Sequence, residues 1–129
     1  MANDSKTILV IDDSSLVRLY YRGILETAGY HVEEALNGLE ALEKLLSIAA
    51  HLLIVDINMP TMDGLTFLSE LRQKELPLAG IPALIISSES KPQDFAAAQL
   101  AGANYYLVKP LEDKTLLDFA ALLTGVRHG

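Results

Sequence analysis

Polar side chains of three kinds directly follow short apolar segments at four places in the sequence. They are two adjacent carboxylates, a single carboxylate, a pair of hydroxyls and an ammonium group: Asp12 and Asp13, Asp56, Ser87 and Ser88, and Lys109. Carboxylates that lie close together repel one another, so that one takes up a proton or a cation sits among them. With an all-oxygen donor set, Mg²⁺ or Mn²⁺ fits such a cluster better than zinc does. A cation, an ammonium and a hydroxyl around one carboxylate are the groups that phosphoryl transfer onto an aspartate requires.

The segments between these polar positions predict which elements would gather them. Five short apolar runs have the length and composition of strands in a parallel sheet. They cover residues 8–11, 30–35, 52–55, 81–86 and 105–108, and the second is less apolar, as is typical of an edge strand. An amphipathic segment follows each run and predicts a helix. The first begins at Ser14 or Ser15 and ends at Gly29, and the others cover 39–48, 65–74, 91–100 and about 112–123.

This alternation of strands and helices predicts the fold class. It is typical of an α/β domain with a doubly wound, five-stranded parallel sheet and helices on both faces. In such sheets function gathers at the edge where the strands deliver their C-terminal ends, so the polar side chains are expected to meet there. The first helix has apolar side chains at helical spacing that are expected to face the sheet: Val17, Tyr20, Tyr21, Ile24, Leu25 and Ala28.

Composition narrows the class of protein. Asp and Glu number 17 against 10 Lys and Arg, a net charge of −7, which argues against nucleic-acid binding through phosphate neutralisation. Cysteine is absent, which excludes disulfides, thiolate zinc sites and cysteine nucleophiles. No apolar run is long enough to span a membrane and no signal sequence is visible, so we expect a cytoplasmic protein without membrane insertion. The length fits one domain, 1–129, with its core at about 7–123 and no output domain.

Each polar position also has a simpler explanation when it is taken alone. Asp13 and Asp56 fit a helix cap or the start of a loop. Ser87 fits a helix cap, and Lys109 fits an ordinary surface lysine. Four independent strand ends with complementary groups are hard to obtain by chance, so the combination favours a common site. The histidines show no ligand spacing and are expected at the surface or at an edge: His31, His51 and His128.

Several motifs at and near these strand ends occur together along the chain. They are residues 8–15, Asp56-Ile57-Asn58-Met59-Pro60, Met62-Asp63-Gly64, Ser87, Ala101-Gly102-Ala103, and Tyr106 through Lys109-Pro110. As a set they resemble the response-regulator receiver domains, of the stand-alone chemotaxis (CheY-like) type, and the resemblance covers about residues 7–123. It implies the flavodoxin-like (βα)5 fold with strand order 2-1-3-4-5. It also implies a phosphorylation-dependent signalling switch of a two-component system rather than an enzyme with independent small-molecule turnover.

The resemblance implies a role for each residue of the acidic cluster. Asp56 would accept a phosphoryl group from a histidine kinase or phosphotransfer protein. Mg²⁺ would be bound by the side chains of Asp13 and Asp56 and by the backbone carbonyl of Asn58. Asp12 would act through a metal-bound water, and Lys109 would pair with the phosphoryl oxygens. The bound phosphoryl group would later be lost through autodephosphorylation.

The resemblance also implies the residues that would transmit the signal. Ser87 would swing to bond the phosphoryl group, and Tyr106 stands where the family keeps a switching aromatic residue. The face of helix four, strand five and helix five would then change. Asn58 and Glu89 occupy the positions that tune hydrolysis of the acyl phosphate. The Lys109–Pro110 peptide bond is expected to be cis, as it is in the family.

The remaining predictions concern partner surfaces on a monomer or weak dimer. Leu16 and Leu19 lie off the core face of the first helix, where receiver domains meet the kinase, although solvent-facing leucines are an alternative. At ~100° per residue, Leu122 falls away from the sheet, which indicates either a partner surface or an ordinary exposed leucine. A downstream target would contact Tyr105 and Tyr106, and Tyr105 is bulkier than the small residue common in chemotaxis proteins.

Two other classes of protein share parts of this pattern. A metal-dependent phosphohydrolase of the haloacid-dehalogenase type also uses an aspartate nucleophile. That class places its two aspartates two residues apart on the first strand, whereas here Asp12 and Asp13 are adjacent. The other alternative is a receiver cut from a longer regulator or hybrid kinase.

Overall fold

A computed structural model describes residues 5–126 of the chain, and its centre is a single parallel sheet. The strands are β1 (Thr7–Ile11), β2 (His31–Ala35), β3 (Leu52–Val55), β4 (Ala83–Ser87) and β5 (Tyr105–Val108). They lie in the order β2-β1-β3-β4-β5, and every neighbouring pair is parallel. The predicted fold class and strand order are therefore confirmed.

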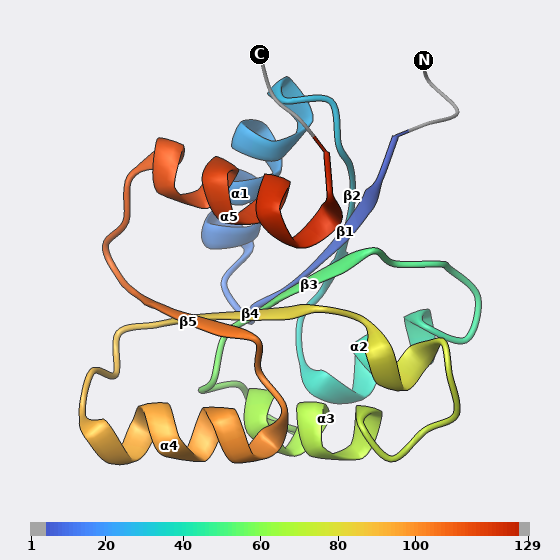
Figure 1. Cartoon of the computed structure of the whole chain (residues 1–129), viewed down its shortest axis with the longest axis vertical. Helices are drawn as coiled ribbons and strands as arrows, with labels where there is room; N and C mark the ends of the chain where they lie inside the picture. The colour runs from blue at the N-terminus through green and yellow to red at the C-terminus, as the bar shows by residue number, and fades with distance from the viewer. Residues whose placement is uncertain (1–4, 127–129) are drawn as a thin grey trace.

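Two helices cover one face of the sheet and three cover the other (Figure 1). They are α1 (Ser15–Thr27), α2 (Gly38–Lys44), α3 (Gly64–Leu71), α4 (Pro92–Ala101) and α5 (Asp113–Thr124), with a short 3-10 helix, η2, at Leu78–Gly80. Helices α1 and α5 lie above the sheet in Figure 1, and α2, α3 and α4 lie below it. Each α-helix follows the C-terminal end of a strand, so the loops that connect them lie along that edge of the sheet.

Two buried clusters explain why β1 and β3 read as continuous apolar runs. Leu9 and Ile11 of β1 pack into the cluster beneath α2, α3 and α4. Ile8 and Val10 pack into the cluster beneath α1 and α5. Since successive side chains of a strand point to opposite faces, a strand covered on both faces needs an apolar residue at every position.

Two predicted helices end earlier in the structure than the hydrophobic pattern indicates. The helix predicted at 39–48 ends at Lys44, and the one predicted at 65–74 ends at Leu71. In both cases the chain tightens at the end, with backbone hydrogen bonds from Ser47 to Lys44 and from Lys74 to Leu71. The apolar spacing continues through such a turn, so periodicity alone extends the helix too far.

The prediction that Tyr20 faces the core is wrong. Tyr21 and Leu25 are buried as expected, but Tyr20 is 52% exposed. Its hydroxyl donates a hydrogen bond to the Asp113 carboxylate at 2.5 Å, so the ring lies at the rim between α1 and α5. The phenol hydroxyl therefore has its hydrogen-bond partner at the surface. A buried phenol would instead need a partner inside the protein.

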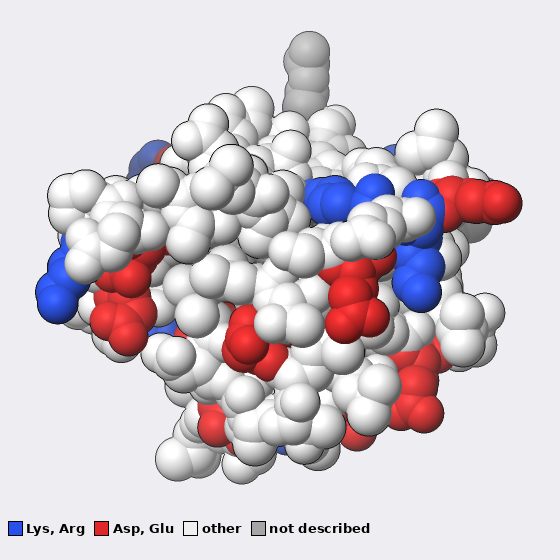
Figure 2. Space-filling view, turned by 90° about the horizontal axis from the view of Figure 1, so that it is seen from below, with Lys and Arg blue, Asp and Glu red and all other residues white. Residues whose placement is uncertain are grey.

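Other predictions about the periphery agree with the structure where it describes them. His31 and His51 are exposed, whereas His128 lies outside the described residues. The Lys109–Pro110 bond is cis, as the family resemblance implied, and Leu76–Pro77 is cis as well. Acidic side chains are scattered over the side seen in Figure 2, among uncharged ones. Within residues 5–126 no helix has the length and apolar character that crossing a membrane demands.

Candidate functional site

Three aspartates meet at the C-terminal edge of the sheet. Asp12 and Asp13 follow β1, and Asp56 follows β3, its neighbour in the sheet. The backbone N–H of Asp56 donates to the carbonyl of Ile11 at 2.9 Å, which extends the ladder to the acidic residues. One carboxylate oxygen from each aspartate lies within 4.8 Å of the others. The predicted convergence of these side chains is thus present in the structure.

Lys109 brings a positive charge to this cluster from the end of β5. Its Nζ lies 3.6 Å from Oδ2 of Asp12 and 3.8 Å from Oδ1 of Asp56. The backbone N–H of Lys109 donates to the carbonyl of Ser87 at 2.8 Å, which fixes the end of β5 against β4. A single ammonium faces three carboxyl groups here, so the charge of Lys109 alone does not balance the cluster.

The environment of Asp56 disfavours its charged form. Burial raises the pKa of this carboxyl to about 6, and the neighbouring charge of Asp12 adds to the increase. Lys109 and the backbone N–H of Ile57 oppose the increase. A divalent cation among the carboxylates would supply the missing positive charge, and the donors are all oxygen. The residues present therefore fit a hard cation such as Mg²⁺.

A second group of predicted residues lies together around the loop from β4 to α4. Ser87 is 1% exposed, and its Oγ accepts a hydrogen bond from the N–H of Glu89 at 3.1 Å. The Tyr106 hydroxyl donates to the backbone carbonyl of Glu89 at 2.8 Å. The Asn58 amide donates to the Glu89 carboxylate at 3.4 Å. Glu89 thus contacts Ser87, which is predicted to bond the phosphoryl group, and Tyr106, the predicted switch residue. It also contacts Asn58 in the loop after β3.

The aromatic ring of Tyr106 is held from one side. It lies edge-on to Phe95 of α4, with ring centroids 4.7 Å apart, and burial raises the pKa of the Tyr106 phenol. Tyr105 points to the other side, where it is 45% exposed and lies edge-on to Phe119 of α5 at 5.1 Å. The two tyrosines therefore couple β5 to a different helix each.

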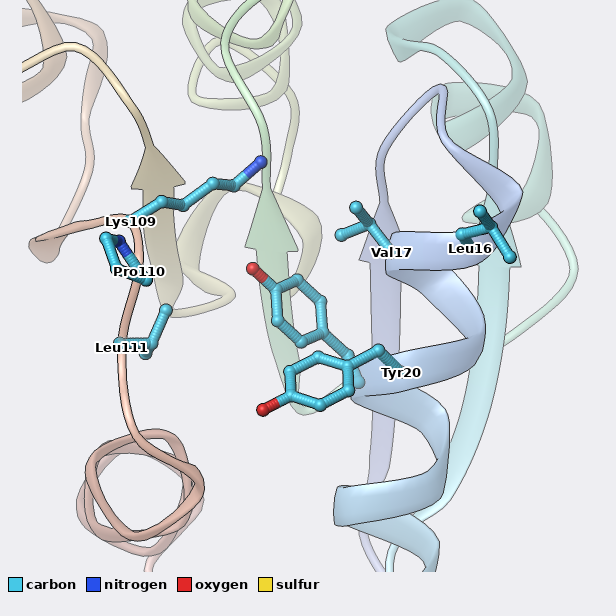
Figure 3. Close-up of a pocket in the computed structure, with 7 residues that line it drawn as sticks. Leu16, Val17, Tyr20, Lys109, Pro110 and Leu111 are labelled. Carbon is cyan, nitrogen blue, oxygen red and sulfur yellow. The ribbon is translucent and has the colours of Figure 1, made fainter.

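The predicted partner residues fall into two separate places. Leu16 and Leu19 are 77% and 63% exposed on α1, whereas Leu122 is 61% exposed on α5. A pocket of about 410 Å³ lies between α1 and the segment that follows β5, and Leu16 is one of its lining residues (Figure 3). The pocket is lined by Leu16, Val17, Tyr20, Tyr21, Lys109, Pro110 and Leu111. Lys109 thus joins the α1 surface to the acidic cluster.

Two residues at the site have contacts to which the sequence assigned no role. A Cβ on Gly64 would lie 2.1 Å from the carbonyl oxygen of Asp56, so only glycine fits there. The motif Met62-Asp63-Gly64 was a signal for this close approach. Arg18 of α1 donates to the carbonyl of Asp12 at 2.6 Å. No pattern in the sequence indicates that contact, because α1 carries other charged residues as well.

The class of protein follows from this arrangement. An acidic cluster on β1 and β3, a buried hydroxyl on β4 and a lysine on β5 stand on one edge of a 2-1-3-4-5 sheet. Residues 8–121 match the family described as response regulator receiver domain. The chain belongs to this family.

Individual relatives include chemotaxis proteins and a sensor kinase, all from Vibrio cholerae. Chemotaxis protein CheY-3 is 36% identical over 115 residues, 88% of each chain. The CAI-1 autoinducer sensor kinase/phosphatase CqsS is 33% identical over 116 residues, which cover 90% of this chain and 17% of the kinase. The structure of CheY4 has a TM-score of 0.85 and 32% identity, covering 92% of this chain and 98% of that one.

A further similar structure is the receiver domain of a histidine kinase from Syntrophus aciditrophicus. Its TM-score is 0.87 at 30% identity, and the match covers 94% of this chain and 91% of that one. The relatives of this chain thus include a protein of similar length and a much longer sensor kinase, of which the match covers 17%.

Family membership carries a general description of function. Receiver domains of two-component response regulators act in phosphorylation-based signalling, with histidine kinases and downstream targets as partners. They are signalling switches, generally not classical enzymes, and generally bind Mg²⁺ at an acidic pocket like the one formed by Asp12, Asp13 and Asp56. The family match favours this class over the phosphohydrolase alternative.

Proposed function

We propose that this chain is a chemotaxis-type switch that accepts a phosphoryl group on Asp56 from a histidine kinase or phosphotransfer protein. The observation that supports the proposal is the position of Asp56 within 4.8 Å of two further carboxylates and 3.8 Å from the Lys109 ammonium. Asp56 is the acceptor in this proposal because it follows the central strand β3 and its carboxylate lies near both Asp12 and Lys109.

Phosphoryl transfer to Asp56 would form one bond and break one. An Asp56 carboxylate oxygen attacks phosphorus while the bond to the donor's imidazole nitrogen breaks, its electron pair staying on that nitrogen. The Lys109 ammonium, 3.8 Å from Asp56, pairs with a phosphoryl oxygen and stabilises the charge that spreads over these oxygens. Hydrolysis by attack of water on phosphorus later returns the free carboxylate, which is the proposed autodephosphorylation.

The acidic cluster would hold the divalent cation. The side chains of Asp13 and Asp56 and the backbone carbonyl of Asn58 are the proposed direct ligands, and Asp12 acts through a bound water. Bound Mg²⁺ neutralises part of the negative charge of the phosphoryl group. Mn²⁺ is expected to substitute, because it accepts the same oxygen donors.

The loop from β4 to α4 would convert phosphorylation into a change of surface. In this proposal the Ser87 hydroxyl leaves the Glu89 N–H and bonds a phosphoryl oxygen. That movement displaces the Glu89 carbonyl, which accepts the Tyr106 hydroxyl, so the ring and its Phe95 contact respond. The side-chain amide nitrogen of Asn58 lies 3.4 Å from a carboxylate oxygen of Glu89, beside the site. Both side chains would tune the approach of the hydrolytic water.

Two surfaces would serve two kinds of partner. Leu16 borders the pocket that Lys109 also lines, and Leu19 is exposed on the same helix, so we assign this surface to the phosphoryl donor. The face of α4, β5 and α5, with Tyr105, Tyr106 and Leu122, is assigned to the downstream target. The protein is expected to be a monomer or weak dimer.

The experiment is labelling with acetyl phosphate in the presence of Mg²⁺, followed on a phosphate-affinity gel. The Asp56→Asn variant should incorporate no phosphate, and the parent protein should incorporate none when EDTA has removed the metal before acetyl phosphate is added. Asp63→Asn is a matched control, because Asp63 caps α3 outside the cluster and asparagine caps equally well. Labelling that persists in Asp56→Asn would show that the acceptor is assigned wrongly.

A further inference from the structure

The carboxylate of Asp13 is held differently from those of its neighbours. Asp12 is buried, and its Oδ1 accepts the N–H of Ser14 at 2.9 Å. Asp13 is exposed, and within the described residues its carboxylate accepts no hydrogen bond. Its direction is therefore set by the backbone that carries it, beginning with the peptide bond between Asp12 and Asp13.

Arg18 fixes that peptide bond from α1. A terminal nitrogen of its guanidinium donates to the carbonyl oxygen of Asp12 at 2.6 Å. The carbonyl of Asp12 and the N–H of Asp13 belong to the same rigid plane. Holding the oxygen therefore restricts the rotation that would swing Asp13 away from the other two carboxylates.

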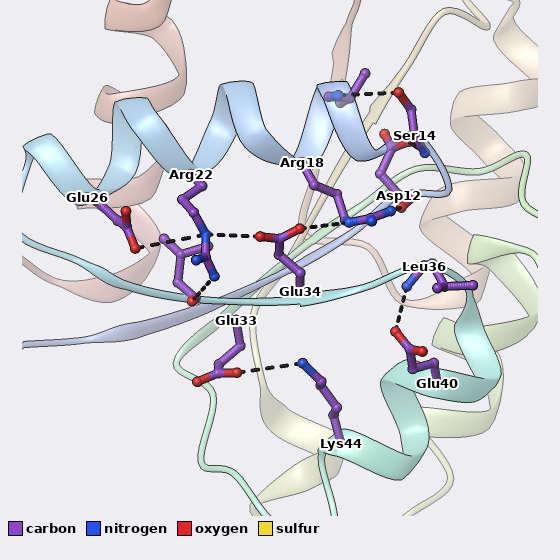
Figure 4. Close-up of polar contacts among 12 residues, drawn as sticks. Asp12, Ser14, Arg18, Arg22, Glu26, Glu33, Glu34, Leu36, Glu40 and Lys44 are labelled. Atoms are coloured by element: carbon purple, nitrogen blue, oxygen red, sulfur yellow. Dashed lines mark hydrogen bonds and ion pairs between the residues drawn. The ribbon is translucent and has the colours of Figure 1, made fainter.

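The guanidinium itself is fixed by a second contact on the opposite side. Nε of Arg18 lies 2.8 Å from Oε1 of Glu34 on β2, and the Arg18 side chain is only 15% exposed (Figure 4). A planar guanidinium with two partners in different directions has little freedom left. Glu34 also balances the charge of Arg18, which stands next to a site proposed for a cation.

Arg22 repeats this arrangement one turn further along α1, away from the acidic cluster. Its Nε lies 3.0 Å from Oε2 of the same Glu34, and a terminal nitrogen donates to the carbonyl of Val32 at 2.8 Å. Both arginines thus connect α1 to Glu34 and to one backbone carbonyl. They differ in which carbonyl they bind. Arg18 binds the carbonyl of Asp12, a residue of the acidic cluster, whereas Arg22 binds that of Val32, which lies outside the cluster.

We propose that Arg18 is a positioning residue for the metal site, with Glu34 as its support. The guanidinium holds the Asp12–Asp13 peptide in the orientation that keeps the Asp13 carboxylate within reach of Asp12 and Asp56. This role rests on the proposed function, because it assumes that the cluster binds Mg²⁺. Groups that orient metal ligands typically change metal affinity by ~10–100-fold when they are removed.

The sign of the effect separates positioning from plain electrostatics. Removal of a positive charge near an acidic cluster, taken alone, strengthens the binding of a cation. Loss of orientation weakens it. A weaker affinity after the loss of Arg18 therefore identifies positioning as the dominant effect, and a stronger affinity identifies charge.

The experiment measures Mg²⁺ binding directly, by NMR titration of amide shifts at constant ionic strength, together with melting temperatures without metal. Arg18→Met removes both contacts and keeps an unbranched apolar stem, and Arg22→Met is the matched control. We expect Arg18→Met to weaken Mg²⁺ binding roughly tenfold. Arg22→Met should bind within about twofold of the parent, while both variants lose a similar amount of melting temperature. Glu34→Gln keeps an acceptor for Nε and should also bind within about twofold.

Several outcomes would overturn the proposal. An unchanged or stronger affinity in Arg18→Met does so, as does an equal loss in Arg22→Met, which would reveal a general effect of stability. Should Arg18→Met not fold, Arg18→Lys takes its place, since one ammonium cannot hold both partners, and unchanged binding in it counts against the proposal. A parent protein that binds no Mg²⁺ overturns the proposed function and this role with it, whereas parent binding with unchanged variants overturns this role alone.

Discussion

The two halves of the functional edge differ in how firmly they are packed. The β1–β3 half comprises β1, β3 and α3; its two strands are buried almost throughout, and α3 contributes Gly64, Phe67, Leu68 and Leu71 to the core. The α4–β5 half comprises α4 and β5, and all four residues of β5 are half-buried or exposed. Helix α4 buries only Ala98 and Ala101. The acidic cluster thus stands on the firmly packed half and Tyr106 on the other.

This difference suits the two tasks of a switch. Carboxylates that must share one cation need fixed positions. The buried strands β1 and β3, which the aspartates follow, provide them. A surface that must change on phosphorylation needs alternatives of similar free energy, and elements with few buried apolar contacts supply them. Glu89 connects the halves, because it contacts both Asn58 and Tyr106.

The largest predicted effect is on the free energy of unfolding, when one phenylalanine side chain is removed from each half in turn. Phe67 is fully buried in α3 and Phe95 is 40% exposed in α4. Phe67→Ala should lower the free energy of unfolding by about 3–5 kcal/mol, the usual cost of a cavity left by a buried phenylalanine. Phe95→Ala should cost about 1 kcal/mol, mainly its edge contact with Tyr106.

Urea unfolding of the two variants and the parent checks this pair. The comparison depends on the difference between them rather than on either value. Equal losses in Phe67→Ala and Phe95→Ala would mean that the α4–β5 half is as firmly packed as the other, and the proposed division would be abandoned.

The next effect concerns coupling between the halves. Tyr106→Ala removes the hydroxyl that binds the Glu89 carbonyl, so partner affinity should respond less to activation while acetyl phosphate labelling is unchanged. The coupling at stake is about 1–3 kcal/mol, a 5–150-fold ratio of affinities. The measurement is partner binding with and without beryllofluoride.

Tyr105→Ala is the control for this measurement. Tyr105 contacts Phe119 rather than the β4–α4 loop, so its removal should weaken partner binding in both states alike. Loss of labelling in Tyr106→Ala would instead place Tyr106 in the chemistry or the fold, and would contradict the separation of the two halves.

The sheet and the acidic pocket could be predicted because both leave local patterns in the sequence. Residues 52–55 are apolar at every position and end directly before Asp56, which predicts a buried strand and its exit. Since the C-terminal ends of parallel strands meet at one edge of the sheet, the sequence alone predicts that Asp12, Asp13 and Lys109 lie near Asp56. The strand order came only from the family resemblance.

Side-chain contacts between distant elements could not be predicted. Arg18 and Glu34 are sixteen positions apart on a helix and a strand, and no periodicity links them. Helical spacing predicted the correct buried face of α1 but extended it too far, to Tyr20. The Tyr20 side chain is exposed at the edge of the contact between α1 and α5, where its hydroxyl donates to Asp113. Such details depend on how closely two helices approach, which the hydrophobic pattern does not encode.

The smallest predicted effect on stability tests the outer surface of the α4–β5 half and its neighbour α5. Leu122 is 61% exposed, so Leu122→Glu should change the free energy of unfolding by less than about 0.5 kcal/mol. Partner binding by the beryllofluoride-activated protein should nevertheless weaken, because a charge replaces an apolar contact. Leu46→Glu is the control, since Leu46 is 80% exposed beside α2, outside the proposed surface. If Leu122→Glu leaves both partner affinity and sedimentation unchanged, Leu122 is an ordinary exposed leucine, and the target surface is confined to α4 and β5.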